Sequence, residues 1–376
     1  RDLHLSIRRQ RQMCIRDIYL GINNEQLCKS KLQGNATAES LKKIFNFITN
    51  NHTISELTSN KTDFTRKNKL TFSSVALKIL NSFQNSVEFD MSTFMPKLGI
   101  KPVSAGAFSI ARYKIKIDFF LELNQKVITY INSLSPKLWK GYRLIAGDGT
   151  SISLPVSKSI IKHFGLFSET KDHTKTVLAN ACILYDVMSN WVLDSVITPF
   201  STGEITSMET MIKQLKIDKS IFILDRGFCS FSTIKTMINS DLKFCVRLKT
   251  SQSLFAKKII GSQFNDFELD WLPSEGEKVT CEKKGLNTDM IHVRATKIIL
   301  PSGEIEVLIS NLFDIDEIHS KDMKELYFKR WAIEEAYKKL KPKMKLEQFG
   351  CRKPEGIYQE FYSHIIMMNI CLLYTS

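Results

Sequence analysis

Apolar residues recur every three or four positions through much of the first third of the chain. This spacing is clear at residues 40–48, 73–83 and 107–123. Apolar positions at i, i+3 and i+4 form one face of an α-helix. Gly99 is typical of a turn between two helices, and Ser104 is placed to cap the second one. The pattern therefore predicts a helical region over residues 36–138, in which residues 91–116 form either a helix-turn-helix-like DNA-binding unit or part of a plain helical bundle.

From residue 142 the period changes. Short runs rich in β-branched and aromatic residues, separated by turn residues, are typical of strands. Such runs occupy residues 143–155, 176–187, 191–200, 220–225 and 242–248. Helical spacing occurs at residues 207–215 and 232–238, on either side of the fourth run. This order predicts an α+β or mixed α/β fold, with a mixed sheet and helices packed on it.

Residues 250–315 interrupt this rhythm. Three more β-type runs lie at residues 270–284, 289–300 and 304–312. We predict that they form β-hairpins, inserted between the sheet and a long helix at residues 327–341. The chain then ends within an apolar helical pattern that has no capping glycine, so we expect a truncated C-terminus. Residues 1–35 open on an arginine-dense stretch and are expected to be a basic arm or a non-native terminus.

The helix at residues 327–341 is the most informative segment. At about 100° per residue, Tyr327, Arg330, Glu334 and Lys341 share a face roughly 60° wide. The opposite side is an apolar stripe that can pack on a core, made of Leu326, Ala332, Ile333, Ala336 and Leu340. A carboxylate among these cations and a phenol suits an acid that binds a metal while its neighbours bind phosphates. The alternative is a solvated face, on which Glu334 and Lys338 form an ordinary i,i+4 pair.

Composition narrows the class of partner. A chain of 376 residues can form two or three domains, and 43% hydrophobic residues is ordinary for a soluble protein. The net charge of +14 is not ordinary and favours nucleic acid as a partner. The eight cysteines include no CxxC pair and no zinc-type spacing, which favours a reducing cytoplasm without disulfides or structural zinc. The longest apolar run, residues 365–374, is too short to span a bilayer, and no signal peptide is evident.

Two aspartates complete a candidate metal site with Glu334. Asp148 lies in GDGT on the first predicted strand, and Asp225 ends the fourth predicted strand in LDRGF. Carboxylates on adjacent central strands, joined by one from a helix beside them, can bind two divalent ions about 4 Å apart. Oxygen ligands favour Mg²⁺ or Mn²⁺ over zinc. The structural alternatives are a simple turn at Asp148-Gly149 and a helix cap at Asp225.

Together these motifs resemble the DDE transposases of bacterial insertion sequences, specifically the insertion-sequence-4 group. That group has a helix with the pattern Y-x2-R-x3-E-x6-K, and Tyr327, Arg330, Glu334 and Lys341 match its spacing in full. GDGT and DRGF resemble its first and second acidic motifs, and residues 250–315 resemble its β-rich insertion domain. Residues 97–115 resemble the region before the catalytic core, so the resemblance covers roughly residues 60–365.

The resemblance implies an RNase H-like core within residues 139–376 and Mg²⁺-dependent cleavage at transposon ends, followed by strand transfer into target DNA. Asp148, Asp225 and Glu334 would be the catalytic metal ligands. The expected DNA contacts are Tyr327, Arg330, Lys341 and Arg226 in the core, and Arg112, Lys114 and Lys116 in the helical region. Trp271 lies far upstream of Glu334, so no aromatic residue of the insertion is assigned to base stacking.

The implied partners are double-stranded DNA, as inverted repeats and as target, and a second copy of the chain in a DNA-bound homodimer. The implied location is the bacterial cytoplasm, with association to the nucleoid. Two other functions remain open at this point. One is an RNase H-like nuclease that cuts without strand transfer, and the other is a catalytically inactive DNA-binding remnant.

Overall fold

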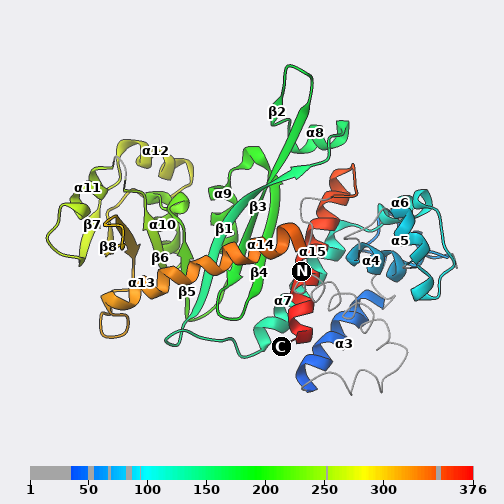
Figure 1. Cartoon of the computed structure of the whole chain (residues 1–376), viewed down its shortest axis with the longest axis horizontal. Coiled ribbons are helices and arrows are strands. Elements are labelled where there is room, and N and C mark those ends of the chain that lie inside the picture. Colours follow the sequence, from blue (N-terminus) through cyan, green and yellow to red (C-terminus); the bar gives the residue numbers. More distant parts are fainter. Residues whose placement is uncertain are drawn as a thin grey trace.

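The structure is a computed structural model (Figure 1). It describes residues 35–49, 55–66, 69–81, 87–93, 95–250, 253–343 and 349–375. The basic arm expected over residues 1–35 therefore lies outside the described residues, apart from residue 35. Within them the fold is mixed α/β, with a mixed sheet at its centre, as the sequence predicts.

The described residues contain a nine-stranded sheet, in the order β2-β3-β1-β5-β6-β9-β8-β7, with β4 paired to β3. The strands are β1 (Arg143–Leu154), β2 (Ser168–Glu169), β3 (Lys175–Asp186), β4 (Trp191–Pro199), β5 (Ser220–Leu224), β6 (Lys243–Leu248), β7 (Asp266–Trp271), β8 (Ile291–Ile299) and β9 (Ile305–Ser310). β1, β5 and β6 are parallel neighbours, while β3 and β4 are antiparallel additions on the β1 side. All five residues of β5 are buried, as expected for a strand covered on both faces.

The β-rich insertion continues this sheet. β9 pairs antiparallel with β6, and β8 and β7 follow outward from β9. The prediction of β-hairpins throughout the insertion was wrong at residues 275–283, which form helix α12 (Glu275–Lys283). The Glu277 carboxylate accepts hydrogen bonds from the Ser274 amide and hydroxyl. This capping pattern starts a helix, and alternation of apolar and polar residues does not reveal it. A further helix, α11 (Leu254–Ile260), was also not predicted.

The helical N-terminal region contains α3 (Asn35–Thr49), α4 (Phe72–Leu80), α5 (Val87–Thr93), η2 (Met95–Leu98), α6 (Ala105–Arg112) and α7 (Ile117–Ser133). Gly99 has a φ of 68°, and the Ser104 side chain accepts a hydrogen bond from the Ala107 amide, so the predicted turn and cap are confirmed. The single helix predicted over residues 107–123 was wrong. It breaks where Ile115 forms a β-bridge with Thr58. Apolar spacing continues across the break because both helices face one core.

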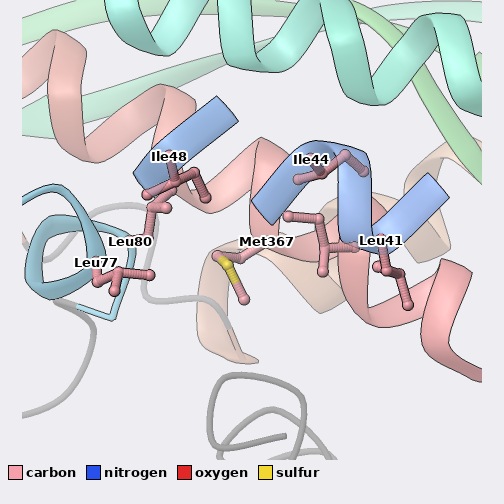
Figure 2. Close-up of a pocket in the computed structure, with 7 residues that line it drawn as sticks. Leu41, Ile44, Ile48, Leu77, Leu80 and Met367 are labelled. Carbon is pink, nitrogen blue, oxygen red and sulfur yellow. The ribbon is translucent and has the colours of Figure 1, made fainter. Parts of the chain in front are cut away.

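The C-terminal helix α15 (Pro354–Thr375) joins the helical region to the sheet. It packs against α7, α4 and α3 on one side and against β4 on another. Buried hydrophobic residues from Leu41 to Leu373 consequently form one core cluster. Figure 2 shows a small apolar recess between these helices, lined by Leu41, Ile44, Ile48, Leu77, Leu80, Met367 and Ile370. Within the described ranges, none of the helices has both the length and the apolar character needed to cross a bilayer.

A buried ion pair reinforces this junction and corrects one expected DNA contact. Arg112 is 4% exposed, and its Nη1 donates to Oε1 of Glu360 at 3.0 Å. Its Nε donates to Gln359, whose side-chain amide donates back to the Arg112 and Ile115 carbonyls. The Arg112 guanidinium is therefore enclosed between α6 and α15, where it is not available to a phosphate.

The two lysines after Arg112 remain closer to the surface. Lys114 is 41% exposed and forms an ion pair of 3.1 Å with Asp63. Lys116 donates to the Glu56 carbonyl at 3.0 Å. Both cations are partly engaged by the protein itself, so their role as DNA contacts stays a prediction.

Candidate active site

Three parallel neighbouring strands place a charged residue at the same level. Gly147 of β1 is in register with Leu224 of β5, and Leu224 is in register with Val246 of β6. Asp148, Asp225 and Arg247 follow these residues by one position. Since adjacent strands lie about 4.8 Å apart, the two aspartates lie beside each other, as the sequence predicts. The arginine beside them was not predicted, although it is a charge that follows the apolar residues Phe244, Cys245 and Val246 in its strand.

The glycines around Asp148 show which way its side chain points. A Cβ atom on Gly147 would lie 2.8 Å from the Met208 Sδ, and one on Gly149 would lie 2.7 Å from the Glu204 Cδ. Both contacts belong to α9 (Glu204–Gln214), which therefore packs directly on this face of β1. Successive side chains alternate between faces, so Asp148 points to the opposite face. β1 continues through Gly149, which excludes the turn alternative.

Asp225 lies immediately after β5, at the start of the short 3₁₀ turn η4 (Arg226–Phe228). Its side chain makes no capping hydrogen bond to that turn, although its carboxylate is close to the Arg226 backbone amide. The carboxylate instead forms an ion pair with Nη2 of Arg247 at 3.0 Å and accepts a hydrogen bond from the Tyr327 hydroxyl at 3.2 Å. The helix-cap alternative therefore does not explain this residue.

The segment carrying Glu334 crosses the face of the central strands (Figure 1). It consists of α13 (Ser320–Phe328), a 3₁₀ turn η5 (Lys329–Trp331) and α14 (Ala332–Lys343). The prediction of one regular helix was therefore wrong at residues 329–331, where the tighter turn shifts the angular spacing. The apolar stripe is confirmed where side chains are described, because Leu326, Ile333 and Ala336 are buried and Ala332 is half-buried against the core.

We use acid cluster for the carboxylates of Asp148, Asp225 and Glu334. Tyr327 and Arg330 both contact members of this cluster. They are 8% and 7% exposed. Arg330 donates from Nη2 to Oε1 of Glu334 at 2.8 Å. The guanidinium groups of Arg330 and Arg247 lie 5.7 and 6.0 Å from the Tyr327 ring centroid. Arg330, which the sequence assigned to phosphates, and Arg247, which it did not, thus lie beside the carboxylates and offset part of their negative charge.

Tyr337 is a site residue that the sequence did not reveal. Its buried hydroxyl donates to the Asp148 carbonyl oxygen at 2.8 Å. Two phenols therefore attach this segment to the sheet on either side of Glu334, Tyr327 at Asp225 and Tyr337 at Asp148. The available signal was a tyrosine near the apolar stripe, three residues after Glu334, where a buried hydroxyl needs a partner.

The two aspartates differ in acidity. Burial raises the pKa of Asp148 to about 6, and the nearby Asp225 and Glu204 carboxylates add to this rise. The Gly149 amide and Arg330 lower the pKa and offset only part of it. Burial acts in the same direction on Asp225, but the Arg226 amide, Arg247, Arg330 and Tyr327 outweigh it and lower its pKa. A divalent cation would favour the charged form of both carboxylates.

The donor chemistry of this cluster fits Mg²⁺ or Mn²⁺, since Asp148, Asp225 and Glu334 offer only carboxylate oxygens. The arrangement is not a preformed cage, because Glu334 is paired with Arg330. Among the described residues, no three side chains of the metal-binding types are grouped closely enough to hold an ion. Metal binding would therefore involve rearrangement of the Arg330–Glu334 pair.

Three further residues considered in the sequence analysis are Arg226, Lys341 and Trp271. Arg226 is exposed and directly follows Asp225. Lys341 belongs to α14, but its side chain lies outside the described residues. Trp271 is 5% exposed and stacks on Phe255 with ring centroids 4.3 Å apart, so it is a core residue.

A model of the transposase DDE domain matches residues 139–370, more than half of the chain. The chain belongs to the DDE-domain transposase family. The matched range includes all three acidic residues and the strands and helices that position them. Membership identifies the chain as a transposase-type enzyme acting on DNA.

Among the solved structures similar to this transposase is the cryo-EM structure of a piggyBac transposase synaptic complex with hairpin DNA. The two share 10% sequence identity with a TM-score of 0.48, and the match covers 89% of this chain and 74% of that chain. A comparison with curated proteins finds no match.

Proposed function

We propose that this transposase belongs to the insertion-sequence-4 group and performs cut-and-paste transposition. It would cleave transposon ends in the presence of Mg²⁺ or Mn²⁺ and join the freed 3′-hydroxyl to target DNA. One observation carries the proposal. Asp148 and Asp225 each follow by one position the paired residues Gly147 and Leu224, and the segment bearing Glu334 is hydrogen-bonded to both aspartates. The parallel β1-β5-β6 core with antiparallel β3 and β4 supports an RNase H-like assignment.

In this proposal Asp148, Asp225 and Glu334 hold two divalent ions. Such ions activate an attacking oxygen and stabilise the leaving oxygen during phosphodiester cleavage. In this proposal Arg330 and the exposed Arg226 bind the phosphates of the strand being cut, because guanidinium groups pair with phosphate oxygens. Lys341, the fourth residue of the helix signature, has the same proposed role. We further propose that two copies of the chain hold the paired ends in the bacterial cytoplasm.

The decisive experiment uses a duplex carrying the inverted repeat that flanks the gene, together with a target plasmid. With Mg²⁺, we expect cleavage at the transposon boundary and covalent joining of the end to the plasmid, and neither product with EDTA. Cleavage without joined product would identify a nuclease without strand transfer. Binding without either product would identify an inactive DNA-binding remnant. Each of the last two results contradicts the proposal.

Tyr337→Phe tests whether this phenol positions the site. A typical hydrogen bond contributes about 0.5–1.5 kcal/mol. We therefore expect the Mg²⁺ concentration for half-maximal cleavage to rise about two- to tenfold, while the cleavage rate at saturating Mg²⁺ changes less. The reason is that the lost bond holds the Glu334 helix against the Asp148 strand.

Tyr185→Phe is the matched control. Tyr185 is also buried, and its hydroxyl bonds to the Asn190 side chain at 3.0 Å within the β3–β4 hairpin. This change should lower thermal stability by a similar amount without altering the Mg²⁺ requirement. Equal Mg²⁺ requirements in Tyr337→Phe and Tyr185→Phe would reduce Tyr337 to a general stabilising residue.

A further inference from the structure

The strand that carries Asp148 continues beyond the acid cluster as an arm. We use β1–β3 arm for residues 150–178, which contain the second half of β1, the helix α8 (Lys158–Phe164), β2 and the start of β3. In Figure 1 the end of this arm at β2 stands clear of the helices that cover the sheet. Nothing in the proposed cleavage chemistry uses these residues.

The arm presents an aromatic pair to solvent. Phe167 is 50% exposed and Phe200, just after β4, is 38% exposed. Their ring centroids are 4.9 Å apart in an edge-on arrangement. Both backbones are anchored, because the Phe167 amide donates to Thr176 and the Phe200 carbonyl accepts from Asn180. The backbone that carries each ring is thus fixed, which lowers the entropic cost of ordering these residues when a planar partner binds.

The charge around this pair favours a polyanion. The arm contains four lysines against two acidic residues, and all four are exposed: Lys158, Lys162, Lys171 and Lys175. One of the acids, Glu169, is already near His173 at 3.3 Å and Lys175 at 3.9 Å. Exposed aromatic rings among lysines suit single-stranded nucleic acid, since rings stack on bases and ammonium groups meet phosphates.

The position of the pair relates it to the reaction. Pro199 is in register with Ala179, and Ala179 with Ile152, so Phe200 lies level with the far part of β1. Strand rise and spacing place the pair on the order of 20 Å from Asp148. DNA with its scissile phosphate at the acid cluster can reach this distance within a few nucleotides.

We propose that the β1–β3 arm is a DNA-binding surface, on which Phe167 stacks against an unpaired base near the cleavage site while Lys171 and Lys175 contact the backbone. The inference rests on the proposed function for its substrate. It adds a contact outside the acid cluster and the Glu334 helix, and it assigns a role to an aromatic pair that the sequence did not single out.

The test measures DNA binding by the full chain in EDTA, where no cleavage occurs. The two probes are a fully paired end duplex and the same duplex with a short unpaired fork. Phe167→Ala should bind the forked probe about five- to a hundredfold more weakly, matching the roughly 1–3 kcal/mol that stacking contributes per base. The fully paired probe should be affected less, and Phe167→Trp should retain wild-type affinity because it keeps an aromatic face.

Two comparisons make the result specific. Phe264→Ala removes a 59% exposed ring before β7, at the other edge of the sheet, and should bind both probes normally. In the Lys171→Ala/Lys175→Ala double variant, the slope of the logarithm of the binding constant against the logarithm of salt concentration should fall by the amount expected for about one to two phosphate contacts. Phe167→Ala should leave this slope unchanged.

Forked-probe binding by Phe167→Ala equal to that of Phe264→Ala would overturn the proposal. So would a loss of self-association in Phe167→Ala by analytical ultracentrifugation with unchanged DNA binding, which would make the arm a contact between copies of the chain. These results are independent of cleavage, so failure of the arm proposal is distinguishable from failure of the proposed catalytic function.

Discussion

Asp225→Asn is expected to lower the rate of transposon-end cleavage by about a thousandfold or more, because residues that act as one catalytic unit lose nearly everything when one member is removed. Asp148→Asn and Glu334→Gln should have effects of similar size. Asparagine keeps an oxygen that can accept from Tyr327 and Arg247, so the fold around position 225 should persist. DNA affinity should stay within about twofold, since binding depends on many phosphate contacts. Initial rates on one end duplex with Mg²⁺, together with gel-shift affinities, provide the measurement.

Asp194→Asn is the matched control for the three acids. Asp194 lies on β4 of the same sheet, and burial raises the pKa of its carboxyl to about 6. No observation connects it with the cluster of Asp148, Asp225 and Glu334, so the variant should cleave at the wild-type rate. Near-wild-type cleavage by Asp225→Asn would show that Asp225 is not a metal ligand, and it would contradict the two-metal assignment.

Arg112→Met is expected to destabilise the protein by about 3–5 kcal/mol, because it leaves the buried Glu360 carboxylate without its cation. Glu360 is 3% exposed, and its other partners are the Gly350 amide and the Cys351 thiol, which supply no positive charge. The loss should appear as a lower urea midpoint. It should also separate the helical region from α15, since this pair joins residues 248 positions apart.

Two further variants test the cause. Arg112→Met/Glu360→Met removes both charges and should recover much of the lost stability, because well-packed apolar residues can replace a buried ion pair. Arg352→Met changes an exposed arginine near the same helix and should shift stability by no more than about 0.5 kcal/mol. A double variant as unstable as Arg112→Met would show that packing around Arg112, rather than the ion pair, stabilises this junction.

Much of the fold was readable from local patterns. The strands from β1 to β6 and the helices between them, except the short β2 and α8, follow the predicted ranges closely, because alternation and helical spacing report which residues face a core. The same method failed at residues 107–123 and 275–283. In the first case two helices share one apolar face, and in the second a capping residue decides the structure. Periodicity contains neither kind of information.

The candidate site also combines features that local sequence predicts with features that only packing of distant segments creates. The sequence by itself determined which residues are the candidates for the chemistry, because GDGT, DRGF and the spacing of Tyr327, Arg330 and Glu334 are local and their residue types suit metal and phosphate binding. Only the tertiary structure decided their partners. Register places Asp148 beside Asp225 and introduces Arg247. Docking of α14 brings Tyr337 to Asp148, and packing of α15 encloses Arg112. A partner across the sheet or 248 positions away leaves no trace in local spacing, since such contacts arise only when distant segments pack together.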